Sequence, residues 1–197
     1  MSGIADTDPL AHLREQTLSS EELLRGHFLH AVRDRVQLPD GTQASREYVR
    51  HPGAVVIVAE QPDGRYVLER QWRYPLDRAF IEFPAGKLDP GEDLLACAQR
   101  ELQEETGYRA RQWAYAGPMH PVIAYSTEVI HIFFARGLVA GERQLDAGEF
   151  LDVFDASLDE LLAWSRDGLL SDAKTLSCLL WLQNVRAGLW PLQWTGA

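Results

Sequence analysis

Three glutamates with helical spacing carry the chemistry that this sequence indicates. They fall in the run Arg100-Glu101-Leu102-Gln103-Glu104-Glu105. In a helix, residues three and four apart share one side, so Glu101, Glu104 and Glu105 span an arc of about 100°. Like charges at this spacing repel one another, which leaves two interpretations: a solvated acidic helix or a bound cation. Carboxylate oxygens suit hard cations, Mg²⁺ first and Mn²⁺ next.

The residues around these glutamates predict the helix that holds them. Gly86 and the cluster Asp89-Pro90-Gly91 indicate a bent loop ahead of the helix. Asp93 is expected to cap its N-terminus, and Gly107 is a good terminator. An apolar stripe is expected to face the core, with the carboxylates at its rim; its members are Leu94, Ala98 and Leu102.

The full spacing of this stretch resembles the signature of the Nudix hydrolases. It runs Gly86, five residues, Glu92, seven residues, Arg100-Glu101, one aliphatic residue, one residue, Glu104-Glu105, one residue, Gly107. Every charged and glycine position is filled, and the one departure is Tyr108, where the family usually has an aliphatic residue. The resemblance implies an α/β/α sandwich with a mixed β-sheet. It also implies an enzyme that uses a divalent cation to hydrolyse pyrophosphate linkages.

Segments outside the signature resemble the ADP-ribose pyrophosphatase branch of this family. They are Arg46 to Val55, Gln71 to Pro75, Ile81 to Gly86 and Gly148 to Val153, within a similarity that covers about residues 25 to 190. In that branch an N-terminal β-hairpin domain is often exchanged between two subunits. The loop after the signature departs from the branch, because Pro121 is followed by Val122 where glycine is usual, and this leaves the exact substrate open.

The expected metal site combines side chains of the helix with the loop before it. Glu101 and Glu105, one turn apart, are the best ligand pair, and Glu104 binds either directly or through water. By resemblance, the carbonyl of Ala85 adds a backbone ligand. Glu82, near the same strand end, either joins the site or belongs to a solvated face.

Acid–base and orienting roles fall to other residues. Arg100 is expected to pair with a helix carboxylate and orient it, and the simpler interpretation is a surface ion pair. Glu92 is expected to support the site, and the simpler interpretation is a solvated loop residue. A metal-bound glutamate is poorly placed to accept a proton, so the general base should be a different carboxylate. Glu149, in an acidic loop before a short strand, is the candidate, supported by the resemblance; Glu128 is the alternative.

Five residues are candidates for holding the substrate. Arg73 either clamps a phosphate bidentately or forms a salt bridge at the sheet edge. Arg46, Tyr48 and Arg50 either hold the nucleotide end through stacking and charge or are ordinary surface residues of a strand. Pro121 lies in the expected substrate loop.

Composition limits the classes of partner. The chain has 197 residues, 46% of them hydrophobic, and a net charge of -10, which argues against a nucleic-acid partner. No apolar run approaches the length of a membrane span, and the N-terminus lacks the features of a signal peptide. Cys97 and Cys178 both fall in expected helices, so no disulfide is expected and the cytoplasm is the default location.

The order of elements predicts an α/β or α+β fold. Residues 1 to about 20 are expected to be disordered or loosely attached. A hairpin follows, from Gly26 to Leu38 and from Thr42 to Arg50, with no partner sheet of its own. We therefore expect an N-terminal tail and dimerisation hairpin at 1–50, a Nudix domain at 51–197, and a homodimer. Further strands are expected at 54–59, 66–72, 80–83, 113–116, 128–135 and 149–154, with later helices capped by Ser157 and Ser171.

Together these features predict a Mg²⁺-dependent enzyme that splits ADP-ribose into AMP and ribose 5-phosphate. The first alternative is hydrolysis of another nucleoside diphosphate derivative, such as a nucleotide sugar, a dinucleotide coenzyme or a diadenosine polyphosphate. The second is a Nudix-fold sensor that binds ADP-ribose without cleaving it. The intact glutamates and the acidic chain disfavour the sensor.

Overall fold

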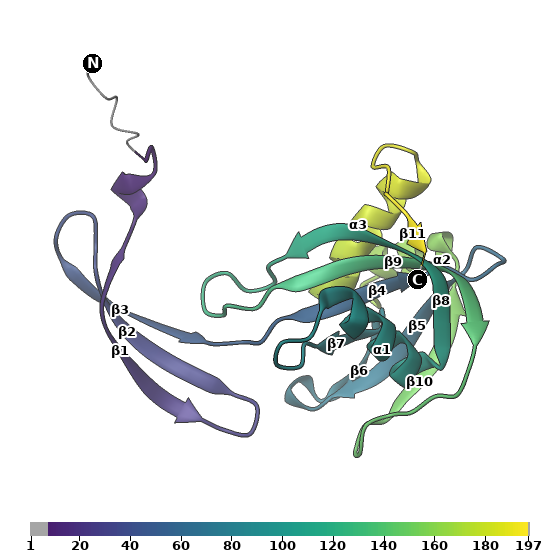
Figure 1. The fold of residues 1–197 in the computed structure, drawn as a ribbon, viewed down its shortest axis with the longest axis horizontal. Helices are drawn as coiled ribbons and strands as arrows, with labels where there is room; N and C mark the ends of the chain where they lie inside the picture. The colour runs from purple at the N-terminus through teal and green to yellow at the C-terminus, as the bar shows by residue number, and fades with distance from the viewer. Residues whose placement is uncertain (1–7, 197) are drawn as a thin grey trace. The chain divides into compact units, whose positions relative to one another are not determined.

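The computed structural model describes residues 8–196 and divides into two compact units. The first unit spans Met1–His51, described from Asp8 onward, together with Val122–Thr127. The second spans Pro52–Pro121 and Glu128–Ala197, described up to Gly196. The ribbon in Figure 1 follows the chain through its elements.

The first unit is a three-stranded antiparallel sheet in the order β1-β2-β3. Its strands are β1 (Gln16–Arg25), β2 (His30–Gln37) and β3 (Gln43–Val49), preceded by a 3₁₀ turn at Ala11–Leu13. The segment Val122–Thr127 joins the unit through β3. Val49 donates its N–H to the carbonyl of Tyr125 at 2.9 Å and accepts from the N–H of Thr127 at 3.0 Å.

The structure corrects two expectations for this unit. The expected disorder of residues 1–20 falls partly on residues 1–7, outside the described part, but residues 16–20 belong to β1. The expected hairpin exists as β2 and β3, yet β1 gives it a sheet of its own. All ten residues of β1 are exposed, so its sequence carries no apolar alternation from which the strand could be predicted.

The second unit contains two sheets and the three α-helices. One sheet has the order β11-β8-β9-β4-β7, and the other β10-β5-β6. β4 runs parallel to β9 and antiparallel to β7, so the larger sheet is mixed, as predicted. The strands are β4 (Ala54–Ala59), β5 (Tyr66–Arg73), β6 (Arg78–Glu82), β7 (Ala85–Lys87), β8 (Tyr108–Met119), β9 (Ile130–Ala140), β10 (Leu151–Ala156) and β11 (Thr195–Gly196).

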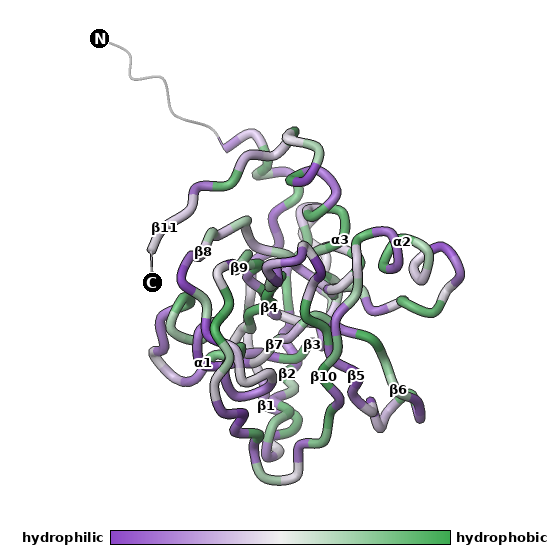
Figure 2. Tube along the Cα trace, turned by 90° about the vertical axis from the view of Figure 1, so that its right-hand side faces the viewer, coloured by the Kyte–Doolittle hydropathy of each residue, from purple (hydrophilic) through white to green (hydrophobic). Residues whose placement is uncertain are grey.

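Strand β4 is the buried centre of this unit. Its six residues, AVVIVA, are all buried, and Figure 2 shows β4 and β9 as apolar stretches. Side chains alternate along a strand, so Val55 and Ile57 pack with one apolar cluster and Val56 and Val58 with the other. Helix α1 (Leu94–Thr106) covers the first cluster, whereas α2 (Leu158–Arg166) and α3 (Ala173–Arg186) cover the second (Figure 1). This arrangement is the predicted α/β/α sandwich.

The helix ends follow local sequence signals in all but one case. Asp93 accepts from the N–H groups of Leu95 and Ala96 at 2.9 and 3.1 Å and so caps α1. Gly107 ends α1 in the left-handed conformation, with φ of 76°. Ser157 caps α2.

The exception is the cap of α3. Ser171 does not cap this helix as expected; its neighbour Asp172 does, because its carboxylate accepts from the N–H of Thr175 at 3.0 Å.

Within residues 8–196 no helix is long and apolar enough to cross a membrane. Cys97 and Cys178 are both buried free thiols.

Candidate active site

Arg100 joins three of the acidic residues on and before α1. It donates from Nε and Nη2 to both oxygens of Glu92, at 2.9 and 3.0 Å. Its Nη1 donates to Glu101 and to Glu104, each at 2.9 Å. Arg100 lowers the pKa of Glu92 to about 2. One guanidinium therefore hydrogen-bonds to three carboxylates, and its role in orienting them for catalysis stays a prediction.

Glu105 lies deeper than the sequence predicted. Its side chain is only 3% exposed, so it belongs to the interior of the unit and not to the rim of the helix stripe. Burial raises its pKa well above the usual range, and the charges of Glu69, Glu101 and Glu149 add to that effect. The pKa of Glu101 rises to about 7, chiefly through burial, although Arg100 opposes the shift. A buried acidic cluster of this kind is typical of functional sites.

The loop before α1 contacts the same two glutamates. The N–H of Ala85 donates to Oε2 of Glu105 at 2.9 Å. Gly86 lies against the carboxylate of Glu101, because a β-carbon at this position would come within 1.9 Å of the Glu101 carboxyl carbon. The structure thus brings Ala85, Glu101 and Glu105 together, three of the four residues that the sequence and the resemblance predict as metal ligands.

Glu149 acts electrostatically on this cluster. It lies in the turn before β10, where Gln71 donates from Nε2 to its Oε1 at 3.0 Å. After burial, its charge is among the causes that raise the pKa of both Glu101 and Glu105. Glu128, the alternative base, lines the pocket that also contains Arg73 and Pro121.

Glu69, on β5, is a functional candidate that the sequence analysis missed. It is 0% exposed, and no N–H or hydroxyl group of residues 8–196 donates to its oxygens, although its side chain lies within hydrogen-bonding range of the Glu105 carboxyl. Burial, followed by the charge of Glu82, raises its pKa to about 8. The sequence offered only one signal, a glutamate on the same strand face as buried Val67, which is equally typical of a solvated strand face.

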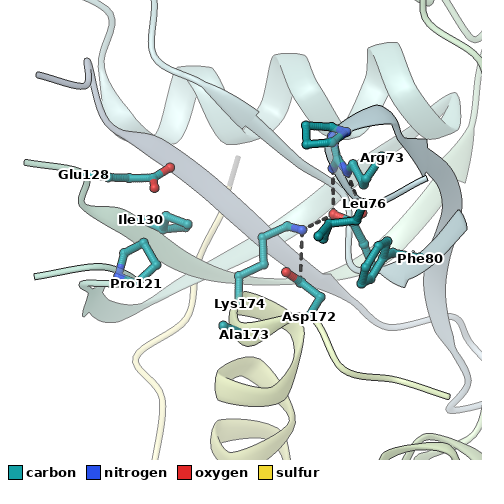
Figure 3. Close-up of a pocket in the computed structure, with 11 residues that line it drawn as sticks. Arg73, Leu76, Phe80, Pro121, Glu128, Ile130, Asp172, Ala173 and Lys174 are labelled. Atoms are coloured by element: carbon teal, nitrogen blue, oxygen red, sulfur yellow. Dashed lines mark hydrogen bonds and ion pairs between the residues drawn. The ribbon is translucent and has the colours of Figure 1, made fainter. Parts of the chain in front are cut away.

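A pocket of about 480 Å³ opens beside the far end of β5. Four of its charged side chains form a chain of contacts, in which Arg73 and Lys174 both bind Glu82. Lys174 also binds Asp172 at 3.0 Å (Figure 3). Arg73 uses Nε and Nη2 for Glu82, each at 2.6 Å, so the salt-bridge interpretation of Arg73 is realised. Its Nη1 has no hydrogen-bond partner in the described part of the chain and can still donate to a ligand.

The remaining substrate candidates divide between the two units. Pro121 lines the pocket together with Arg73. Arg46, Tyr48 and Arg50 belong to the first unit. There Arg46 pairs with Glu15, and Tyr48 donates to Asp34 at 3.0 Å. Lys174 and Asp172 were missed, because their contacts join Glu82 to residues about ninety positions further along the chain.

The donor set fits the divalent cation that the resemblance implies. Within residues 8–196 no three His, Cys, Asp or Glu side chains already surround one point as metal ligands would. Glu101 is held by Arg100, and Glu105 by the N–H of Ala85. The chemistry nevertheless suits a hard cation, because the cluster consists of buried and half-buried carboxylates, and no N–H or hydroxyl group of the described residues donates to the oxygens of Glu69.

Two family models match the chain. The NUDIX domain matches residues 49–176, and the nucleoside diphosphate sugar hydrolase N-terminal domain matches residues 15–49. A solved structure described as an ADP compounds hydrolase has a TM-score of 0.81. It is 23% identical and covers 89% of this chain and 96% of its own, which supports the fold.

Relatives of known activity are similar over most of their length. The methanol dehydrogenase activator of Bacillus methanolicus is 37% identical over 86% of this chain and 92% of its own. The ADP-ribose pyrophosphatase of Bacillus subtilis is 36% identical over 87% of this chain and 94% of its own. The GDP-mannose pyrophosphatase of Yersinia enterocolitica is 32% identical over 85% and 94%. The chain is therefore a member of the Nudix hydrolase family.

Proposed function

We propose that this enzyme hydrolyses the pyrophosphate bond of ADP-ribose, with a divalent cation, to AMP and ribose 5-phosphate. The observation that carries the proposal is the buried carboxylate cluster of Glu101 and Glu105 against the loop at Ala85 and Gly86. Relatives named ADP-ribose pyrophosphatase support this substrate, including the Bacillus subtilis protein. Nudix hydrolases generally use divalent metal cations, and we propose Mg²⁺, with Mn²⁺ as a substitute.

The cation would be held by Glu101 and Glu105, with the Ala85 carbonyl and Glu104 as further ligands. When bound, it neutralises the anionic pyrophosphate and makes an attacking water more acidic. Arg100 keeps Glu101 and Glu104 oriented through its hydrogen bonds at 2.9 Å. The protein's own contribution is thus a set of carboxylate ligands whose positions are fixed before the substrate binds.

The general base in this proposal is Glu149. One of its carboxylate oxygens accepts the proton of the attacking water as the oxygen of that water forms a bond to phosphorus, and the bond to the bridging oxygen breaks. Gln71 orients Glu149 through its hydrogen bond at 3.0 Å. Arg73 is our candidate for the phosphate, through Nη1, beside Pro121 in the pocket. Arg46, Tyr48 and Arg50 remain candidates for the nucleotide end.

A nucleotide sugar is the second candidate substrate. Two observations favour it: the description of the model that matches residues 15–49 and the similarity to GDP-mannose pyrophosphatases. A substrate panel separates the two, with ADP-ribose, ADP-glucose, GDP-mannose, NADH, FAD and diadenosine tetraphosphate, each with Mg²⁺ and with EDTA. The expected result is the highest kcat/KM for ADP-ribose, with AMP and ribose 5-phosphate as products. A higher kcat/KM for GDP-mannose would replace our assignment.

We also propose that the enzyme is a homodimer in the cytoplasm. The first unit exposes large apolar side chains on β1 and on the turn that follows it, which is typical of a protein interface; they are Leu18, Leu23, Leu24, Phe28 and Leu29. Within the described residues β1 pairs only with β2, so its other edge has no strand partner. The two free thiols suit a reducing compartment.

A further inference from the structure

Glu69 faces the helix that carries the signature glutamates. Side chains alternate along β5, so Glu69 shares a face with Val67. Val67 packs in the cluster that contains Leu102 of α1, whereas Leu68 packs in the cluster on the other side. Glu105 lies three residues after Leu102, on the same side of α1. Glu69, two residues beyond Val67, is therefore directed toward the turn of α1 that presents Glu105.

The surroundings of Glu69 compensate its charge only in part: burial and Glu82 raise its pKa more than Lys174, Arg73 and Glu105 lower it. Glu69 is fully buried, and no N–H or hydroxyl group of residues 8–196 donates to either oxygen, but its side chain lies within hydrogen-bonding range of the Glu105 carboxyl. Its cross-strand neighbour on β6 is Glu82, which takes the hydrogen bonds of both Arg73 and Lys174. Buried polar groups in native proteins nearly always have a hydrogen-bond partner. A buried carboxylate with no N–H or hydroxyl donor therefore requires an explanation, such as an ion that binds there.

Electrostatics connect Glu69 to the proposed metal ligands. After burial, Glu69 is the largest cause of the raised pKa of Glu105, ahead of Glu101 and Glu149. Two carboxylates that repel one another in the protein interior are expected to be stabilised in their charged forms by a cation that binds both. The protein supplies only part of this stabilisation, because the hydrogen bonds of Arg73 and Lys174 go to Glu82, although the charges of both also lower the pKa of Glu69.

We propose that Glu69 is an additional carboxylate of the cation site, and that its two oxygens acquire their partners when the divalent cation binds. The inference rests on the cation dependence of the proposed function. Glu69 then does not stabilise the protein when no cation is bound. Its role is to increase the affinity of the site for the divalent cation. A supporting ligand or partner of a metal site typically changes affinity by about 10–100-fold.

The test compares cation binding in four variants. Glu69→Met removes the carboxylate with an apolar side chain of similar length, and Glu69→Gln removes its charge with almost no change in shape. Glu101→Gln removes a proposed direct ligand, and Glu142→Gln removes an exposed acid outside the site. Mn²⁺ is titrated and its free concentration is followed by electron paramagnetic resonance, and Mg²⁺-dependent thermal unfolding gives a second measurement.

The expected result is a Kd for Mn²⁺ at least ten times higher in Glu69→Met, which corresponds to about 1.4 kcal/mol of lost binding energy. Without cation this variant should unfold at the same temperature as wild type or higher, so that only the stabilisation by cation is reduced. Glu142→Gln should match wild type throughout. A wild-type Kd in both Glu69 variants would overturn the proposal, and so would failure of both to fold without cation, because Glu69 would then be structural.

The same experiment separates this inference from the proposed function. If wild-type protein binds no cation, or Glu101→Gln binds as well as wild type, the proposed metal site itself is wrong. If wild type binds and Glu101→Gln does not, while the Glu69 variants bind normally, only the role of Glu69 is refuted.

Discussion

The carboxylate of Glu101 occupies the space where a side chain at Gly86 would begin. A β-carbon built on Gly86 comes within 1.9 Å of the Glu101 carboxyl carbon and within 2.2 Å of both oxygens. The absence of a side chain at position 86 is thus what allows a helix glutamate to approach the loop backbone beside Ala85. This glycine is required by a close approach, since its backbone does not adopt the left-handed conformation that favours glycine elsewhere in the chain.

Gly86→Ala is therefore expected to damage activity far more than stability. The new methyl group displaces the flexible end of Glu101, and a displacement of about 1 Å at a reacting centre costs roughly 10²-fold in rate. The backbone itself has no reason to move, so thermal unfolding should be nearly unchanged. Steady-state kinetics and calorimetry on the same sample check both parts.

Gly64→Ala is the matched control for this substitution. Gly64 has φ of 82° and open space around it, so alanine there costs about 1 kcal/mol of backbone strain without touching the site. Stability should fall while kcat/KM is retained. If Gly86→Ala behaves like Gly64→Ala, the proximity of Glu101 to the loop has no catalytic meaning.

Glu105→Gln is expected to lower kcat/KM by about 10³-fold. A catalytic cation supplies several kcal/mol of charge stabilisation, and this variant removes one of its direct ligands. The amide oxygen can still accept from the N–H of Ala85, which donates to Glu105 at 2.9 Å, so the fold should remain intact. Activity near that of wild type at saturating Mg²⁺ would remove Glu105 from the metal site.

The helix of the signature was predictable because its signals are local. Asp93 and Gly107 are read from the chain itself, and both cap or end α1 as expected. Strand β1 was not predictable, because a strand with no buried face shows no alternation. The cap of α3 was placed one residue early, since serine and aspartate are adjacent and both are common caps.

Burial set the limit on predicting the site. Spacing selected Glu101 and Glu105, but it did not reveal that Glu105 is buried, because this depends on how α1 packs against β4, β7 and β8. Glu69 and Lys174 were missed for the same reason. A single charged residue in a strand or helix is usually exposed, and only tertiary structure shows that these two are not.

Light scattering of the full chain is expected to give a mass near twice 22.2 kDa. Leu24→Glu places a charge on exposed β1 and should shift the mass toward that of one chain, because a charge on an interacting strand edge opposes pairing. Val139→Glu, at an exposed position of β9, is the control and should leave the mass unchanged. A wild-type monomer at micromolar concentration would refute the homodimer.

Lys174→Met is expected to destabilise the second unit by about 3 kcal/mol at neutral pH, the lower part of the range for breaking a buried ion pair. The lysine is almost fully buried and pairs with Glu82 and Asp172, whereas Arg73 still compensates Glu82 in the variant. Urea unfolding measures the loss. A change below about 0.5 kcal/mol, usual for surface substitutions, would contradict the importance of this network.

The effect of this substitution should depend on pH. Burial alone would raise the pKa of Glu82 and of Asp172, but Lys174 acts with Arg73 on Glu82 and with Thr175 on Asp172 to hold both below their ordinary values. A carboxyl whose pKa is lower in the folded state stabilises the fold above its unfolded pKa, near 4.5 for Glu82 and 3.8 for Asp172, and loses this contribution as pH falls further. The stability difference between wild type and Lys174→Met should therefore shrink below about pH 4.

The general base is tested by comparing Glu149→Gln with Glu128→Gln. Glutamine at position 149 can still accept from Gln71, which now donates to Oε1 at 3.0 Å, so the side chain should keep its place and lose only its basicity. A positioned base contributes about 10²–10⁴-fold in rate, so kcat should fall by that factor in Glu149→Gln while KM changes little.

Glu128 occupies a different position and predicts a different result. It lines the pocket beside Arg73 and Pro121, where it can influence how substrate binds. Glu128→Gln is therefore expected to change KM more than kcat. If Glu128→Gln instead loses kcat with KM retained, and Glu149→Gln does not, the proton is taken by Glu128 and the hydrogen bond from Gln71 merely fixes a surface turn. Loss of kcat in Glu149→Gln that exogenous formate or azide partly restores would identify a missing base directly, because a small anion can replace a carboxylate but not a structural contact.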